Sequence, residues 1–342
     1  MTVGGNEDPD QSLEWLILGF QYGHVLRTFV CLGVVDLLDE SPRGLADLAA
    51  RTGTDVQSLG RLLLAARALG LVDVATEGDY VLGPLGERLT DRPDHVFRRL
   101  ADLYAPWLSQ PWNHLEDAVR TGEAVFASVH GTDYWSYVAS NPTAAASFNE
   151  MMASGTVARA IAVSEVLDLP PGTVVVDVGG GTGGLLAAVL QRNPSWRGIL
   201  ADTEEVVAGA PDVLDAERVR DRVEVVATDF FQKVPGGGDV YVLSRILHDW
   251  ADEPAEAILR STRAAMREGA RLVIIEGVMP EPQDTDPAYL LDLAREDLEM
   301  LVLVGGRERT LREYRGVLAR TGFDIADVHA SPGRDLIVAT AR

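Results

Sequence analysis

The chain has 342 residues, of which 46% are hydrophobic and 24% are charged, a composition typical of a soluble globular protein with room for two domains. Its formal net charge of -22 disfavours binding to nucleic acid, because no basic face is visible that would contact the phosphate backbone. No apolar run is long enough to span a membrane, and the chain does not start with a basic segment followed by an apolar one. We therefore expect a cytoplasmic protein that binds neither nucleic acid nor a membrane.

The first expected elements are apolar helices. From Leu13 to Phe20, and then on to Leu38, apolar residues recur on almost every turn. A helix that is apolar nearly all round is buried, either within the monomer or against a second chain, and the sequence leaves both possibilities open. Cys31 lies in this stretch; as the single cysteine it forms no internal disulfide, and we expect a buried core thiol.

Residues 44–83 have the pattern of a winged helix-turn-helix. Its expected elements are helices at residues 45–53 and 56–69 and strands at residues 72–74 and 80–82. In a DNA-binding regulator the second helix would enter the major groove. Here that helix carries only Arg61 and Arg67 among leucines and alanines, so we interpret it as a packing element. A ligand-sensing, DNA-binding dimer is the alternative from another functional class.

The most informative segment is a buried-strand run, Val174–Val178, that leads directly into a glycine-rich turn at residues 179–184. Its β-branched residues predict a central parallel strand, and the glycines allow backbone N–H groups to approach a ligand closely. Such a turn serves dinucleotides, triphosphates or S-adenosylmethionine. No Gly-Lys-Ser/Thr follows, which disfavours a triphosphate. Asp177 would repel a pyrophosphate but can bind a cationic group, which favours S-adenosylmethionine.

Each of the next strands leads into candidate ligand residues. These strands are expected at residues 198–202, 223–227 and 239–244. Asp202 ends the first of them, about 20 residues beyond the glycines, where it can accept both ribose hydroxyls. Asp229 and Phe230 follow the second and offer a carboxylate for an exocyclic amine and an aromatic face for a purine. Strands with interleaved helices predict a doubly wound, Rossmann-like α/β sheet with its site at the carboxyl ends.

His248 follows the last of these strands and is the candidate general base, because histidine titrates near neutrality. A structural histidine in a turn is the alternative. Such a base needs an acceptor at its other ring nitrogen, and Glu276 and Glu308 are the two candidates. Asp249 is expected to point elsewhere and to cap the helix that begins near Asp252.

Four motifs resemble, in order and spacing, those of the S-adenosylmethionine-dependent small-molecule O-methyltransferases of the plant caffeate type and their bacterial antibiotic-tailoring relatives. They are Asp177–Gly183, Asp229–Phe231, Leu247–Trp250 and Gly306–Thr310. The resemblance extends from about residue 12 to the end of the chain. It implies a homodimer with a winged-helix-like dimerisation domain at residues 1–100 and a catalytic domain at residues 101–342, of which about 101–165 form a helical linker.

The resemblance also implies roles for individual residues. Methyl transfer to a hydroxyl, with S-adenosylhomocysteine as product, would use His248 with Glu276 or Glu308. The implied cofactor contacts are Asp177, Gly179, Gly181, Asp202, Asp229, Phe230, Thr156, Ser244 and Arg245. The implied contacts to an aromatic substrate are Trp135, Met152, Met300 and Asp249. Plant members have lysine and tryptophan where this chain has Ser244 and Arg245, which indicates the bacterial branch.

No metal is expected, since the histidine supplies the proton acceptor and no His/Asp/Glu cluster has the spacing of metal ligands. A fold does not determine a reaction, however, and the same scaffold can serve hydroxylation, decarboxylation or a pericyclic step. The sequence does not decide which acceptor is methylated.

Overall fold

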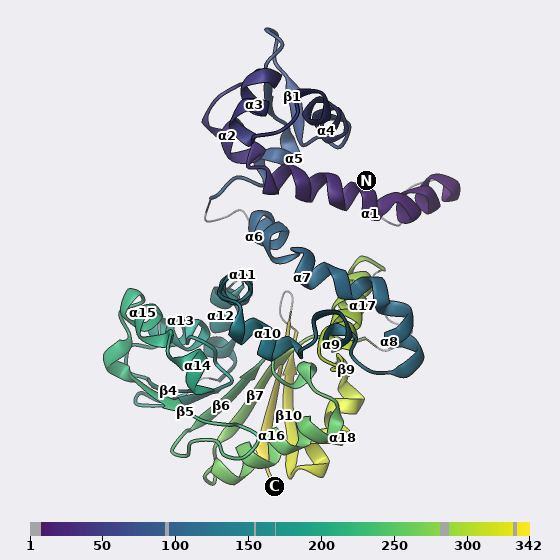
Figure 1. Ribbon diagram of the computed structural model, residues 1–342. Coiled ribbons are helices and arrows are strands. Elements are labelled where there is room, and N and C mark those ends of the chain that lie inside the picture. The colour runs from purple at the N-terminus through teal and green to yellow at the C-terminus, as the bar shows by residue number, and fades with distance from the viewer. Residues whose placement is uncertain (1–7, 93–95, 154, 168, 281–286, 331–333) are drawn as a thin grey trace. The chain divides into compact units, whose positions relative to one another are not determined.

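A computed structural model describes residues 8–92, 96–153, 155–167, 169–280, 287–330 and 334–342. The contacts between residues divide the chain into two compact units, one up to Ser109 and the other from Gln110 (Figure 1). The division predicted from the sequence, between residues 100 and 101, lies inside helix α6 (Val96–Leu103) and stays a prediction.

The first unit contains the expected winged helix. Its elements are α1 (Pro9–Cys31), α2 (Val34–Glu40), α3 (Leu45–Thr52), α4 (Val56–Ala68), β1 (Val72–Val74), β2 (Tyr80–Leu82), α5 (Pro84–Glu87), α6 and α7 (Pro106–Ser109). Gly53 ends α3 in the left-handed region with a φ of 66°, and the Asp55 side chain caps α4 by accepting from Ser58 N at 2.8 Å. β1 and β2 then pair as an antiparallel hairpin.

Helix α1 is apolar on more than its buried side. Phe29 and Val30 are buried in the core of the first unit. Large apolar side chains nearer its start are exposed, namely Leu13, Trp15, Leu16, Ile17 and Phe20. Cys31 is also exposed, so the prediction of a buried thiol is wrong: the two preceding residues occupy the buried face of the helix end. The exposed apolar side chains leave α1 with a face suited to a second chain.

Among the described helices, no single one is both long and apolar enough to cross a membrane. Helices α1 and α2, which meet at a bend of 56°, are together long and apolar enough, judged by length and composition only.

The second unit is a seven-stranded sheet between layers of helices (Figure 1). Its strands are β3 (Val174–Val178), β4 (Arg197–Asp202), β5 (Val223–Ala227), β6 (Val240–Ser244), β7 (Arg271–Glu276), β10 (Phe323–His329) and β11 (Asp335–Ala341), and β8 (Val278–Met279) pairs separately with β9 (Arg309–Thr310). The order is β10-β11-β7-β6-β3-β4-β5. The five strands from β7 to β5 are parallel, and β11 joins β7 in antiparallel orientation.

The helices of the second unit cover both faces of this sheet. They are η1 (Gln110–His114), α8 (Leu115–Thr121), α9 (Phe126–His130), α10 (Tyr134–Ser140), α11 (Pro142–Ala153), α12 (Thr156–Leu167), α13 (Gly184–Arg192), α14 (Glu204–Val207), α15 (Ala210–Ala216), η2 (Arg220–Arg222), η3 (Leu247–Asp249), α16 (Asp252–Ala265), α17 (Pro287–Leu303) and α18 (Leu311–Arg320). One core cluster packs α16 and α18 on the sheet, and another packs α12, α13 and α15 on the opposite face. The carboxyl ends of the parallel strands therefore meet at one edge, which is where a doubly wound sheet places its site.

Candidate active site

The glycine turn after β3 brings backbone close to two acidic residues. Gly181 has a φ of 62°, and a Cβ added there would meet no described heavy atom within 4 Å. Its N–H donates to Asp202 Oδ2 at 2.8 Å, while Thr203 N donates to Asp202 Oδ1 at 2.7 Å. The turn thus combines open space, which close approach of a ligand requires, with a carboxylate fixed beside it.

Asp177 lies directly beneath this turn and is almost completely buried. Its Oδ2 has no hydrogen-bond partner among the described residues. Burial and the neighbouring charge of Asp202 raise the pKa of Asp177 to about 7, and the charge of Arg159 acts in the opposite direction. A buried carboxyl oxygen without a donor is costly, so its natural complement is a cationic or hydrogen-bond-donating group.

Phe230 lies against the same turn. A Cβ on Gly179 would collide with the Ile246 side chain and would lie 3.5 Å from a ring carbon of Phe230. Asp229, next to Phe230, is exposed and accepts from Phe231 N at 3.0 Å. The structure thus brings Gly179 and Phe230 together. Asp229 lies two residues beyond the end of β5, the strand that pairs with β4, which ends in Asp202.

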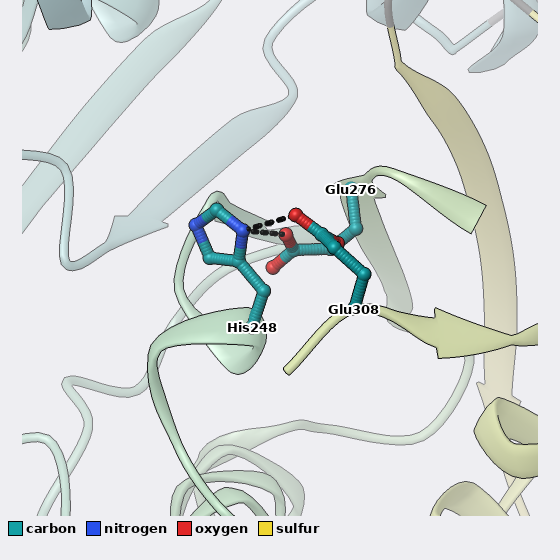
Figure 2. Close-up of side chains that lie close together, drawn as sticks. All are labelled: His248, Glu276 and Glu308. Atoms are coloured by element: carbon teal, nitrogen blue, oxygen red, sulfur yellow. Dashed lines mark hydrogen bonds and ion pairs between the residues drawn. The ribbon is translucent and has the colours of Figure 1, made fainter. Parts of the chain in front are cut away.

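His248 lies in the η3 turn after β6 and is almost completely buried. Its Nδ1 lies 2.7 Å from Glu308 Oε1 and 3.7 Å from Glu276 Oε2 (Figure 2). Glu276 Oε1 instead accepts from the backbone N–H groups of Ile246 and Leu247, both at 2.9 Å. The two carboxylates that sequence alone left as equivalent candidates therefore make different contacts: Glu308 binds the ring, and Glu276 binds the backbone that carries it.

Asp249 is buried beside the other ring nitrogen, with its Oδ1 3.5 Å from His248 Nε2. The prediction that Asp249 caps the next helix is wrong, because the N-cap of α16 is Ala251 and no side chain caps it. The tight η3 turn accounts for the difference, since it ends before the helix begins and leaves Asp249 inside the site.

The carboxylates around His248 determine its charge. Burial by itself would lower the pKa of His248, but Glu276, Asp249 and Glu308 together raise it to about 9. In return, although burial opposes it, the charge of His248 holds the pKa of Glu308 below its usual range. Burial raises the pKa of Glu276 and raises that of Asp249 to about 7. The cluster therefore has a high affinity for one proton on the imidazole.

Three side chains of this cluster, those of His248, Glu276 and Glu308, lie close enough together to bind a metal ion. One ligand atom each from His248, Glu276 and Glu308 lies within 4.8 Å of the others. The contacts within the cluster are, however, those of an oriented histidine, because a carboxylate 2.7 Å from Nδ1 fixes the tautomer. The prediction of a metal-free enzyme stays a prediction that chelation tests directly.

The other residues predicted to contact cofactor or substrate lie on helices of the second unit or at the end of β6. Arg245 follows β6 with a φ of 59°, unusual for a residue with a side chain, and its Nε is buried without a hydrogen-bond partner among the described residues. Trp135 packs edge-on against Tyr134 and Phe148, at centroid distances of 4.9 and 5.7 Å. Thr156 begins α12, Ser244 ends β6, and Met152 and Met300 lie on α11 and α17; these four are half-buried, and their roles stay predictions.

Three arginines near the site were not singled out from the sequence. Arg159 donates to Thr156 Oγ1 at 3.0 Å and to Met152 O at 2.9 Å, and its charge acts on Asp177. Arg334 directly precedes β11 and pairs with Glu296 at 2.7 Å. Arg309 is buried, with 1% of its surface exposed. Arginine is rarely buried unless it is paired, but solvent exposure cannot be read from a single sequence, so only the apolar surroundings of Arg159 gave a signal.

Comparison with known proteins decides the family. A family model described as an O-methyltransferase domain matches residues 112–324, and one described as an O-methyltransferase dimerisation domain matches residues 15–92. The chain belongs to the O-methyltransferase family. The family and the fold expected from the sequence motifs are thereby confirmed.

Individual relatives agree with this assignment. The O-demethylpuromycin-O-methyltransferase of Streptomyces alboniger is 41% identical over 93% of this chain and 85% of its own length. The structure of a mitomycin 7-O-methyltransferase covers 97% of this chain and 98% of its own at 31% identity, with a TM-score of 0.91. An O-methyltransferase from neocarzinostatin biosynthesis, solved with S-adenosylmethionine and 2-hydroxy-5-methyl naphthoic acid, covers 94% and 96% of the two chains at 30% identity, with a TM-score of 0.83. Some other relatives are named as N-methyltransferases.

This O-methyltransferase therefore uses S-adenosylmethionine, as predicted, and carries a dimerisation domain at its N-terminus. The names of these relatives describe the acceptors of those proteins.

Proposed function

We propose that this enzyme methylates a phenolic hydroxyl of an aromatic secondary metabolite and that His248 removes the hydroxyl proton. The observation that carries the proposal is the buried His248–Glu308 pair, with Nδ1 and Oε1 2.7 Å apart. In the neutral form of the imidazole this carboxylate accepts from Nδ1–H, so the tautomer with a free lone pair on Nε2 is favoured. Nε2 is then the atom that receives the proton.

The methyl donor fits the residues around the glycine turn. The buried Oδ2 of Asp177 suits the cationic amino group of the cofactor, and the open backbone at Gly181 suits close approach of a ligand. Asp202 would bind the ribose, and Asp229 with Phe230 the adenine, while Gly179, Thr156, Ser244 and Arg245 complete the expected contacts. When bound, S-adenosylmethionine supplies an electrophilic methyl group and leaves as S-adenosylhomocysteine.

The protein's own part in the reaction is to hold the hydroxyl and to take its proton. As Nε2 of His248 accepts the proton, the O–H bond breaks and the hydroxyl oxygen becomes the nucleophile. Glu308, Glu276 and Asp249 then stabilise the imidazolium, which is the form that their charges favour. Such a base contributes on the order of 10²–10⁴ to the rate.

An aromatic acceptor fits the chemistry of the predicted pocket residues. Trp135 carries an aromatic face within a cluster of rings, and its buried Nε1–H has no acceptor among the described residues. The thioethers of Met152 and Met300 suit flat aromatic surfaces. Relatives of this chain are named for aromatic acceptors such as 3-amino-4-hydroxybenzoate and a dihydroxynaphthoate.

We also infer that the enzyme acts as a homodimer. The match to the dimerisation domain and the exposed apolar side chains of α1, from Leu13 to Phe20, support this inference. Light scattering of the purified protein is expected to give twice the mass of one chain.

The test uses S-adenosylmethionine labelled on its methyl group and two matched sets of bicyclic aromatic acceptors. One set carries a hydroxyl, and the other carries an amine at the same position. We expect a labelled methyl ether from the hydroxyl set, with the same yield after exhaustive treatment with EDTA. Labelling of the amines alone would assign N-methylation instead, and activity lost to EDTA and restored by a metal would contradict the metal-free mechanism.

A further inference from the structure

The turn that carries His248 is held only weakly by its own backbone. Two hydrogen bonds close η3: Asp249 N donates to Ile246 O, and Trp250 N donates to Leu247 O, each over 3.3 Å. Both distances exceed the usual 2.7–3.2 Å range of N–H···O bonds. A three-residue turn with such long bonds does not by itself fix the position of a catalytic ring.

The segment after α17 supplies shorter bonds to the same turn. Arg309, on β9, donates from Nη1 to Leu247 O and from Nη2 to Trp250 O, both at 2.8 Å. The backbone N–H of Arg307 donates to His248 O, also at 2.8 Å. One neighbouring segment therefore donates hydrogen bonds to the carbonyls of Leu247, His248 and Trp250. These bonds are shorter than the two hydrogen bonds within the turn.

The residue that makes these bonds must be an arginine. Nε and Nη2 of Arg309 also donate to Asp252 Oδ1, at 3.2 and 3.0 Å, so its planar fork connects a carboxylate on α16 with two carbonyls of the turn. A lysine presents its three donors on one atom and cannot span these acceptors together. The fork is inaccessible to water, since Arg309 is 1% exposed, and the bonds are not exchanged for bonds to solvent.

The same segment also holds the ring, because Glu308 lies between Arg307 and Arg309 and binds His248 Nδ1. Close contact of the two segments depends on Gly306, where an added Cβ would collide with His248 O. Backbone and ring of the base are thus positioned together by residues 306–309.

We propose that Arg309 is a positioning residue for the general base: it holds the turn so that the ring of His248 stays against Glu308. The inference rests on the proposed function of His248, but it concerns a residue outside the sites predicted from the sequence. Misplacement of a reacting group by about 1 Å can reduce the rate by about 10²-fold, so loss of the fork should act mainly on turnover.

The experiment compares Arg309→Lys with a matched control, Arg320→Ala. Arg320 pairs with the same carboxylate, Asp252, at 3.3 Å but is half exposed, and its side-chain hydrogen bonds to described residues go to Asp252 and Glu256 rather than to the turn. Three quantities are measured: kcat with saturating cofactor, the affinity for S-adenosylhomocysteine, and the titration of the His248 imidazole by NMR in the unliganded protein. The His248 signal is assigned from its absence in His248→Gln.

For Arg309→Lys we expect kcat to fall by about 10²-fold, unchanged affinity for S-adenosylhomocysteine, and a His248 pKa lower by about one unit, because the ring drifts from Glu308. Arg320→Ala should match the wild type in all three. In the double variant Arg309→Lys with Glu308→Gln the two losses should not multiply, because both act on the same ring.

Wild-type turnover together with wild-type titration of His248 in Arg309→Lys would overturn the proposal. If that variant does not fold, Asp252→Asn is measured instead, because it removes the charge of the carboxylate that holds the fork. It should lower kcat and the His248 pKa by smaller amounts. No change in either quantity would also overturn the proposal. The titration needs no turnover, so it separates this inference from the proposed function. Full activity of His248→Gln would contradict the role of His248 as the base, but it would not change what the titration shows about how Arg309 positions the ring.

Discussion

The turn that follows β3 and the turn that follows β6 both start from buried strands at the carboxyl edge of one sheet. In the first, Gly181 lies beside open space, and Asp177 has a buried oxygen without a donor among the described residues. In the second, the backbone around His248 donates a hydrogen bond to Glu276 and accepts one from Arg309. Under the roles proposed for them, the turn that receives a ligand keeps unsatisfied groups, whereas the turn that moves a proton keeps its catalytic group fixed.

Apart from replacement of His248 itself, the largest effect that separates the two turns is expected from Glu308→Gln. An amide keeps the shape of the side chain but removes the charge that stabilises the imidazolium, so kcat should fall by about 10²-fold or more. Binding of S-adenosylhomocysteine, measured by calorimetry, should stay within about threefold of wild type, a change of less than 0.7 kcal/mol. A variant that loses binding and keeps kcat would reverse the roles assigned to the two turns.

A smaller effect, of the opposite kind, is expected from Asp202→Ala. This change removes the carboxylate beside Gly181 and should weaken cofactor binding by about tenfold, or about 1.4 kcal/mol. Turnover at saturating cofactor should change little. The exposed Glu205 provides the control, since Glu205→Ala removes a carboxylate three residues away along the chain. Equal effects of the two substitutions would show that only the general charge matters.

The smallest effect concerns pH, where activity and stability should respond in opposite directions. The pKa of His248 is raised to about 9, compared with about 6.5 for an unperturbed imidazole. Its protonated form therefore stabilises the fold fully below about pH 6.5, and this stabilisation is lost as the pH rises to about 9. The pKa values of Asp177 and Asp249 are also raised, to about 7, so the stabilisation from their protonated forms is lost as the pH rises from about 4 to about 7.

Over the same interval kcat/KM for the acceptor should rise, because only the neutral imidazole accepts a proton. Chemical denaturation and initial rates between pH 6 and 9.5 measure both trends. In Glu308→Gln the acid limb of the rate profile should move to lower pH, since one of the three carboxylates is lost. A limb that does not move would mean that another group titrates.

Local patterns were sufficient to predict much of this fold. The hairpin at Val72–Val74 and Tyr80–Leu82 and the parallel strands β3, β4, β5 and β6 lie where period and composition indicated, because β-branched runs and turn glycines act within a few residues. The antiparallel pair β10 and β11 at the edge of the sheet was not anticipated, since pairing partners depend on tertiary contacts rather than on the strand sequences.

For the site, the motifs brought His248 and two glutamates into consideration, but distances between segments some 60 residues apart were needed to separate Glu308 from Glu276. Asp249 was placed wrongly because a carboxylate before a helix usually serves as a cap, and here the η3 turn takes it inside. Arg309 lies in the Gly306–Thr310 motif, but its role gave no local signal, because its partners lie on a turn far away in the chain.

The central claim is that the glycine turn holds the methyl donor and His248 makes the transfer occur. It is tested most directly by His248→Gln, measured for S-adenosylhomocysteine binding by calorimetry and for single-turnover methylation of a hydroxylated acceptor. We predict binding within about threefold of wild type and a rate lower by about 10³-fold. Binding and rate both close to those of the wild type would contradict the assignment of His248 as the base.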